Sequence, residues 1–258
     1  MLGDAVAAPD RLKLWILPAS HPCVAVEKAL RLKGLAYDRV VLLPPMQAPV
    51  MRVMFGKRTV PGLVLSGGEK VVGSRAIVRV LDGLAPDPPL LPADAALRAK
   101  VERAEDWGDE VLQPLGRRLL WAAFQRDPSA MASFTEGSKL PLPLPLVKVV
   151  SPMAARVSGR INGASDVAAA ADLAALPGHL DRIERWIDQG VIGGEDPNAA
   201  DLQIASSLAL LMRVGDLRGP IAARPAGRYA QRVFPEYPGD VPAGTLPAGW
   251  LGPLSAAA

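Results

Sequence analysis

The sequence is poor in the residues that form disulfides and metal sites. Among 258 residues there are one cysteine and two histidines. A single cysteine excludes an internal disulfide, which is usual for proteins of a reducing compartment. The two histidines, His21 and His179, share no ligand spacing with each other or with the cysteine, so we expect no metal site.

Long apolar runs and blocks of like charge are also lacking. No stretch approaches the roughly 18 apolar residues that a transmembrane helix needs, so we expect no membrane partner. The first ten residues lack the basic and apolar regions of a secretory signal, and we expect a cytoplasmic protein. The 29 Lys and Arg residues face 26 Asp and Glu along the whole chain. This mixture predicts an ordinary solvated surface and no nucleic-acid partner.

The first third of the chain alternates short apolar runs with helical patterns. The order is βαβ followed by ββα. The predicted elements are, in chain order, a strand at 13–17, a helix at 23–33, a strand at 37–42, a short helix at 48–55, strands at 62–65 and 70–72, and a helix at 74–82.

A cluster of prolines at 84–92 ends this alternation, and we place a domain boundary there. Apolar residues then recur every three or four positions from 97 to 122, which predicts a long amphipathic helix bent near Pro114. The remaining predictions are a connector at 140–146, helices at 146–159, 180–187 and 199–214, and a proline-rich tail from Pro220 that wraps the surface. The domains would therefore be 1–83 and 93–258, joined by the linker 84–92.

The segment Ser20-His21-Pro22-Cys23 stands between the first predicted strand and the first helix. Pro22 suits the first turn of a helix, and a helix start stabilises a thiolate placed there. The segment therefore predicts a thiol-handling site. Ser20 is either its functional hydroxyl or a plain helix cap, and Cys23 is either a redox thiol or a small buried residue. His21 is either a titrating group of the cleft or a solvated loop residue.

Four short motifs stand in order along the chain. They are Ala19-Ser20-His21-Pro22-Cys23, Thr59-Val60-Pro61, Ser74-Arg75-Ala76-Ile77 and Asn198-Ala199-Ala200-Asp201. Together they resemble the cytosolic glutathione S-transferase family over about residues 12–215. The first motif resembles the segment with the catalytic Ser or Cys of the tau, zeta and omega classes. The resemblance implies a thioredoxin-like α/β N-terminal domain followed by an all-α C-terminal helical domain.

The resemblance also implies a role for each motif. Ser20 would donate its hydroxyl to the sulfur of bound glutathione, or Cys23 would act as the key thiol. Pro61 would follow a cis peptide bond, and the backbone of Val60 would pair with the tripeptide. The implied glutathione-binding residues are His21, Arg58, Val60, Pro61, Ser74 and Arg75. The implied electrophile pocket includes Trp107 and Val111 of the long helix.

The implied function is a bacterial, homodimeric detoxification enzyme that activates a glutathione thiolate for attack on a small hydrophobic electrophile or a peroxide. Two alternatives stay open. One is a thiol–disulfide or deglutathionylating oxidoreductase that uses Cys23. The other is a non-catalytic binding or scaffold protein on the same fold.

Gly73 favours the non-catalytic alternative. The family usually has Glu or Asp at this position, where it holds the γ-glutamyl ammonium group. Loss of such a charge-assisted hydrogen bond would cost on the order of 1.5–3 kcal/mol of binding. An acid from the long helix of a partner subunit, Glu105, Asp106 or Asp109, is one hypothetical replacement.

Overall fold

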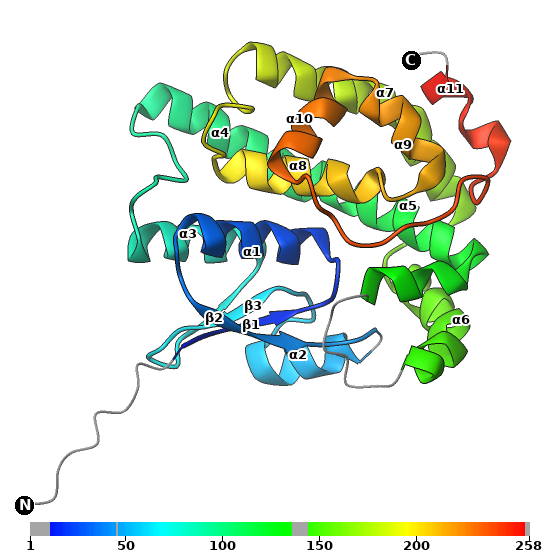
Figure 1. Cartoon of the computed structure of the whole chain (residues 1–258), viewed down its shortest axis with the longest axis horizontal. Coiled ribbons are helices and arrows are strands. Elements are labelled where there is room, and N and C mark those ends of the chain that lie inside the picture. The colour runs from blue at the N-terminus through cyan, green and yellow to red at the C-terminus, as the bar shows by residue number, and fades with distance from the viewer. Residues whose placement is uncertain (1–10, 45, 136–143, 256–258) are drawn as a thin grey trace, which may run out of the picture.

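The computed structural model describes residues 11–44, 46–135 and 144–255. A four-stranded sheet with helices is followed by a region built mostly of helices, which confirms the predicted fold class (Figure 1). The elements of the first region are β1 Leu12–Ile16, α1 His21–Leu32, β2 Tyr37–Val41, α2 Gln47–Phe55, β3 Gly62–Val64, β4 Lys70–Val72 and α3 Ser74–Leu84. The larger helices of the second region are α4 Ala95–Trp107, α5 Gln113–Arg126, α6 Leu144–Ile161, α7 Asp166–Asp188, α8 Ala199–Leu211, α9 Gly215–Ala222 and α10 Pro225–Val233.

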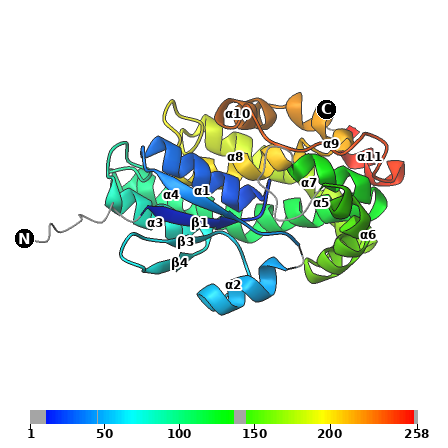
Figure 2. The ribbon, with the colours of Figure 1, turned by 60° about the horizontal axis from the view of Figure 1, so that its bottom comes forward.

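The sheet has the strand order β2-β1-β3-β4. Strand β1 runs parallel to β2 and antiparallel to β3, and β3 pairs with β4 as a hairpin. Helices α1 and α3 cover one face of the sheet, and α2 lies on the other, away from the helical region (Figures 1 and 2). Helix α1 is therefore held between the sheet and α8. Its first turn is buried on all sides, which a pattern of local hydrophobicity does not reveal.

The predicted long helix is present as two α-helices joined by a π-helical turn. This turn, Gly108–Leu112, lies between α4 and α5, immediately before Pro114. A π-turn leaves one residue out of the α-helical ladder, so the helix continues despite the N–H that proline lacks. After this turn, Gly116 of α5 lies against the His21 ring at the start of α1.

The C-terminal region is more helical than predicted. Helix α7 begins at Asp166, capped by Ser165, and continues through Pro177. The tail predicted to wrap the surface from Pro220 begins inside α9 and contains α10, a helix that the sequence analysis did not predict. Pro225 occupies the first turn of α10, where a missing N–H costs nothing, so it starts a helix and does not break one.

The proline-rich linker contacts both halves of the chain. The Lys33 ammonium donates to the carbonyl of Pro88 (2.5 Å) and to Asp82 (2.7 Å). Farther along, the backbone N–H of Ala199 donates to the carbonyl of Leu90 (2.8 Å). We keep 84–92 as the proposed domain boundary. Of the connector predicted at 140–146, residues 140–143 lie outside the described residues and 144–146 begin α6.

None of the helices in the described parts of the chain is long and apolar enough to cross a membrane.

Candidate active site

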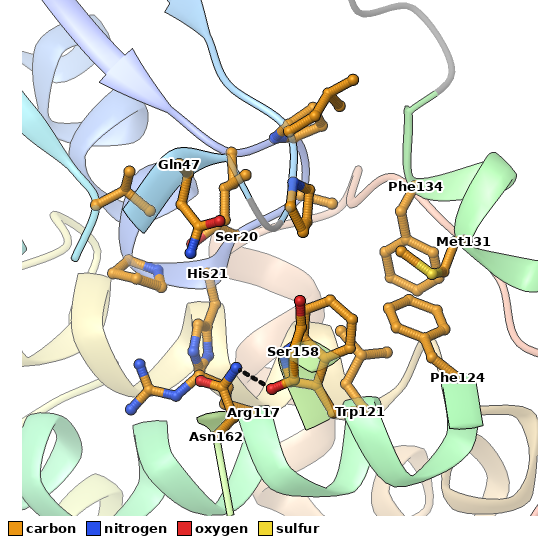
Figure 3. A pocket seen from close by; sticks show the side chains of 18 of the residues that line it. Ser20, His21, Gln47, Arg117, Trp121, Phe124, Met131, Phe134, Ser158 and Asn162 are labelled. Atoms are coloured by element: carbon orange, nitrogen blue, oxygen red, sulfur yellow. Dashed lines mark hydrogen bonds between the residues drawn. The ribbon is translucent and has the colours of Figure 1, made fainter. Parts of the chain in front are cut away.

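A cavity of about 400 Å³ lies where the start of α1 faces α5 and α6 (Figure 3). Four of the residues predicted for the site line it together, although they come from different parts of the chain. These residues are Ser20, His21, Arg58 and Val60. The fold therefore brings the first two sequence motifs to one place.

Ser20 precedes the first residue of α1 and lines the cavity. Ser20 occupies the N-cap position of α1, but its hydroxyl forms no capping hydrogen bond with the helix, which argues against a plain capping role for the side chain. The residue before it, Ala19, has a left-handed φ of 55°, and the N–H of Ser20 donates to the carbonyl of Leu17 (3.2 Å). This tight turn places the serine hydroxyl at the cavity and the helix start beneath it.

Cys23 lies behind this turn and is 1% exposed. Burial raises the pKa of its thiol to about 12, although hydrogen bonds from Ser20 and the Leu17 backbone lower it. At neutral pH the thiol is therefore protonated and out of reach of a substrate. These observations argue against the catalytic role predicted for Cys23 and favour its interpretation as a small buried residue.

His21 is 3% exposed, so its interpretation as a solvated loop residue is wrong. Its ring packs against α5, where a Cβ added at Gly116 would lie 3.6 Å from the ring carbon Cε1. Burial, and to a smaller extent the positive charge of Arg117, lower the pKa of His21 to about 3. The Nδ1 atom is buried without a hydrogen-bond partner. The cavity wall therefore contains a neutral imidazole.

The buried imidazole predicts that acid destabilises the protein. The His21 imidazole takes up a proton near pH 6.5 in the unfolded state but only near pH 3 in the folded state. The free energy of unfolding therefore falls as the pH drops from 6.5 toward 3. From pH 7 to pH 5 this one group is expected to remove about 2 kcal/mol of unfolding free energy. Urea denaturation at both pH values, for the wild type and His21→Gln, measures the contribution.

The His21→Gln variant is expected to lose correspondingly less stability between the two pH values. His179→Gln is the matched control, because the His179 ring is only partly buried and burial lowers its pKa less. Equal losses in the wild type and His21→Gln would contradict the prediction.

The backbone of Val60 lies beside the cavity, next to a proline. The Val60–Pro61 peptide bond is cis, as the family resemblance implied. Within the described residues, no backbone hydrogen bond engages the N–H or C=O of Val60. Arg58 lies exposed at the cavity edge, and Gln47 of α2, which the sequence analysis missed, lines the same wall. The amide oxygen of Gln47 is buried without a partner.

The opposite wall is aromatic and also escaped the sequence analysis. Phe124 contacts Trp121 edge-on at 5.4 Å between ring centroids and Phe134 at 5.0 Å. Met131 lies beside them (Figure 3). The spacing of Arg117, Trp121 and Phe124 on α5 is that of one helical face, but only the packed structure shows that this face borders a cavity.

Trp107 and Val111, predicted for the electrophile pocket, lie elsewhere. They line a second hollow between α4 and α7, together with charged residues such as Arg103 and Arg182. Trp107 packs edge-on against Trp186 at 5.2 Å between ring centroids. We therefore leave both residues out of the site. Among the described residues, no group of three or more His, Cys, Asp or Glu side chains is arranged to hold a metal ion.

Residues 14–89 match the family model of the glutathione S-transferase N-terminal domain. The N-terminal domain of the chain belongs to the glutathione S-transferase family. This confirms the resemblance inferred from the motifs, while the tau, zeta or omega class stays a prediction. No curated protein matches the chain in sequence.

Solved structures extend the likeness in fold to the helical region. A glutathione S-transferase from Rhodospirillum rubrum is 22% identical with a TM-score of 0.56, over 93% of this chain and 98% of its own. Poplar glutathione transferase F1 is 15% identical with a TM-score of 0.58, over 86% and 91%. A glutathione transferase homologue from Sulfitobacter with bound glutathione is 18% identical with a TM-score of 0.50, over 86% and 91%.

The third motif of the family resemblance is placed less favourably for glutathione. Ser74 is buried and does not line the cavity, and its hydroxyl donates to the side-chain oxygen of Gln203 (3.1 Å). Arg75 forms an ion pair with Asp106. Gly73 has a φ of 97°, which favours glycine, and the space beside its Cα is open. Position 73 therefore supplies no carboxylate where the family usually has a glutamate or an aspartate.

The acids considered as replacements from a partner subunit already have partners in their own chain. Glu105 is buried and pairs with Arg79, and Asp106 pairs with Arg75. Asp109 accepts hydrogen bonds from the side chains of Gln113 (3.0 Å) and Gln203 (3.2 Å). If one of these carboxylates bound the γ-glutamyl ammonium group in a neighbouring subunit, it would lose these contacts. The structure therefore gives that hypothesis little support.

Tyr237 is a further residue that the sequence analysis missed. Its hydroxyl, buried in the C-terminal tail, donates to the carbonyl of Ala19 (2.8 Å), directly before Ser20. Its own carbonyl accepts from Arg213 (2.8 Å). The tail therefore supports the turn that positions Ser20 in this glutathione transferase fold.

With the glutathione transferase activity that we propose below, a Tyr237→Phe variant is expected to lower kcat/KM for conjugation about threefold to tenfold, because the turn that positions Ser20 loses a support. The unpaired Ala19 carbonyl would also cost about 1–3 kcal/mol of stability. Tyr229→Phe is the matched control, since the Tyr229 hydroxyl donates to the Asp201 carbonyl (3.4 Å) away from the cavity. Equal activity losses in both variants would show that Tyr237 has no specific positioning role.

Proposed function

We propose that the protein is a glutathione transferase that stabilises a glutathione thiolate at Ser20 and directs it at an electrophile in the adjoining cavity. The observation that carries this proposal is the uncapped Ser20 hydroxyl, which lines a cavity of about 400 Å³ at the start of α1. Free N–H groups and a partial positive charge at this helix start favour an anion. The neighbouring Arg58 and Arg117 add positive charge.

The tripeptide would lie along the wall formed by α2 and the loop before β3. The N–H and C=O of Val60 would pair with its central residue as an added strand does. Gln47 and Arg58 supply an amide and a cation for its glycyl end. At its γ-glutamyl end the backbone N–H of Ser74, at the start of α3, remains the proposed contact, since the hydroxyl is engaged by Gln203.

The chemistry proposed for Ser20 is positioning and charge stabilisation. The thiol of glutathione loses its proton to solvent. The Ser20 hydroxyl then turns from the Cys23 sulfur to donate its hydrogen bond to the glutathione sulfur anion, which lowers the pKa of the bound thiol. The sulfur lone pair forms the bond to the electrophilic carbon, and the leaving group departs with its electron pair. The aromatic wall holds the electrophile within reach.

Calorimetric titration with glutathione tests the proposal. We expect a dissociation constant at or below about a millimolar, near −4 kcal/mol, despite Gly73. Conjugation of 1-chloro-2,4-dinitrobenzene by the same preparation tests the reaction itself. No binding at several millimolar would overturn the proposal.

The second candidate is a non-catalytic binding protein on the same fold. Gly73 and the engaged Ser74 hydroxyl favour it, because both weaken the γ-glutamyl end of the site. Glutathione affinity distinguishes it from the enzyme. The deglutathionylating alternative has no such support, since it depends on the buried Cys23. A homodimer in a bacterial cytoplasm stays a prediction, and sedimentation velocity tests the dimer.

A further inference from the structure

The cavity beside Ser20 is lined by cations and by no carboxylate. Arg58 and Arg117 both contribute to its wall, and none of the described residues that line it is Asp or Glu. A cavity with fixed positive charge and no internal counter-ion favours an anionic occupant. Arg58 lies exposed at the edge, whereas Arg117 of α5 reaches the wall from the helical region.

Arg117 lacks the partner that its neighbour has. The Arg118 guanidinium binds both oxygens of Asp172, at 2.7 Å each. Within the described residues, no carboxylate forms an ion pair with Arg117, and the nearby Asp109 is engaged by two glutamines. Burial and the charge of Arg118 lower the pKa of Arg117. The charge of Arg117 is therefore partly desolvated and lacks a direct ion pair, with Asp109 as a nearby opposite charge, and an anionic ligand would supply a direct partner.

His21 completes this corner of the cavity. The residue is 3% exposed, and the Nδ1 atom has no partner in the described structure. A neutral imidazole offers one N–H donor and one acceptor. Beside Arg117 it adds a polar group without adding a competing negative charge.

The other end of the cavity suits an aromatic ring. Trp121 and Phe124 lie one and two helical turns beyond Arg117 on the same face of α5, about 6 and 10 Å along the helix axis. Figure 3 shows His21 and Arg117 near one end and Phe124, Met131 and Phe134 at the other. A benzoate whose carboxylate binds the Arg117 guanidinium would extend its ring from there toward this aromatic face.

We propose that the electrophile is an aromatic molecule with a carboxylate, which binds Arg117 at the His21 end while its ring lies against Trp121 and Phe124. This inference rests on the proposed function and names the substrate class of the same site. In such a substrate the glutathione sulfur forms a bond to a ring carbon, and a halide leaves from that carbon with the bonding electrons. The carboxylate takes no part in the bond changes and only orients the ring.

Binding without glutathione tests the inference separately from the transferase activity. The probes are 3,5-dinitrobenzoate and its methyl ester, which have the same ring and no leaving group. Quenching of tryptophan fluorescence reports binding near Trp121. The acid is expected to bind at least about tenfold more tightly than the ester, and Arg117→Gln is expected to reduce this preference to about twofold or less.

Arg103→Gln is the matched control, because it removes an exposed positive charge from α4 in the second hollow and should leave the preference unchanged. Arg117→Lys keeps the charge and should retain part of the preference if Arg117→Gln folds poorly. Equal binding of acid and ester by the wild type would overturn the inference. An Arg117→Gln variant that lost glutathione affinity but kept its preference for the acid would also overturn it, since Arg117 would then serve the thiol.

The kinetic form of the test uses 4-chloro-3,5-dinitrobenzoate and its methyl ester, each rate divided by its uncatalysed rate with glutathione. The acid is expected to have the higher kcat/KM in the wild type and to lose that advantage in Arg117→Gln. A protein that prefers the acid in binding but conjugates neither compound would contradict the proposed function and leave the anion site intact.

Discussion

A Ser20→Ala variant is expected to conjugate glutathione about 10- to 100-fold more slowly at pH 7, measured as kcat/KM. A hydrogen bond to a charged group contributes about 1.5–3 kcal/mol, and loss of this bond would raise the pKa of the bound thiol. The ultraviolet absorbance of the thiolate, followed against pH in the complex, measures that pKa directly. It should shift upward in the variant.

The structure allows this effect to be separated from a loss of stability. The Ser20 hydroxyl caps no helix N–H and its contact with the protein is a hydrogen bond to the Cys23 thiol, so Ser20→Ala should change the unfolding free energy by no more than about 1 kcal/mol. Cys23→Ala is the control for the neighbouring thiol and should keep its activity, since Cys23 is buried and protonated. A Ser20→Ala variant with an unchanged thiol pKa would assign activation to another group.

An Asp201→Ala variant is expected to lose about 3 kcal/mol of unfolding free energy, the largest stability effect that we predict. The Asp201 carboxylate is fully buried and accepts from the backbone N–H groups of Asn198 (2.8 Å) and Gly193 (2.7 Å). Without it, two donors are left unpaired in the core, each at a cost of about 1–3 kcal/mol. Urea denaturation at pH 7 measures the loss.

Asp94→Ala provides the matched comparison for Asp201. Asp94 caps α4 with the same chemistry, accepting from the N–H of Leu97 (2.7 Å), but in an exposed position. Its removal should cost only about 1 kcal/mol, because water replaces the lost partner. Equal losses in the two variants would show that burial of the Asp201 network adds nothing.

The capping box at the start of α8 illustrates what a local pattern predicts well. Asn198 and Asp201 were assigned to a structural cap from their spacing alone, and both halves of that cap are present. The alternating elements of the first 84 residues follow the predicted order for the same reason. Such features depend on contacts between residues a few positions apart, so the sequence contains the information directly.

The α9 and α10 helices show where a local pattern misleads. The prolines predicted a tail that wraps the surface from Pro220, but Pro220 lies inside α9, and Pro225 lies in the first turn of α10, where proline is compatible with a helix. The distinction depends on which residue begins the helix. For α10, packing against α8 stabilises the helix after Pro225, and this is a tertiary effect.

By itself, the sequence determined the order of strands and helices, the turn at Ser20, the cap of α8 and the family of the N-terminal domain. Only the tertiary structure decided that Cys23 is buried, that Ser74 donates to Gln203, and that Arg117 faces the cavity. Tyr237 reaches Ala19 across 218 positions in the chain. Burial, pKa and cavity lining depend on groups far apart in sequence, and a local pattern contains no record of those contacts.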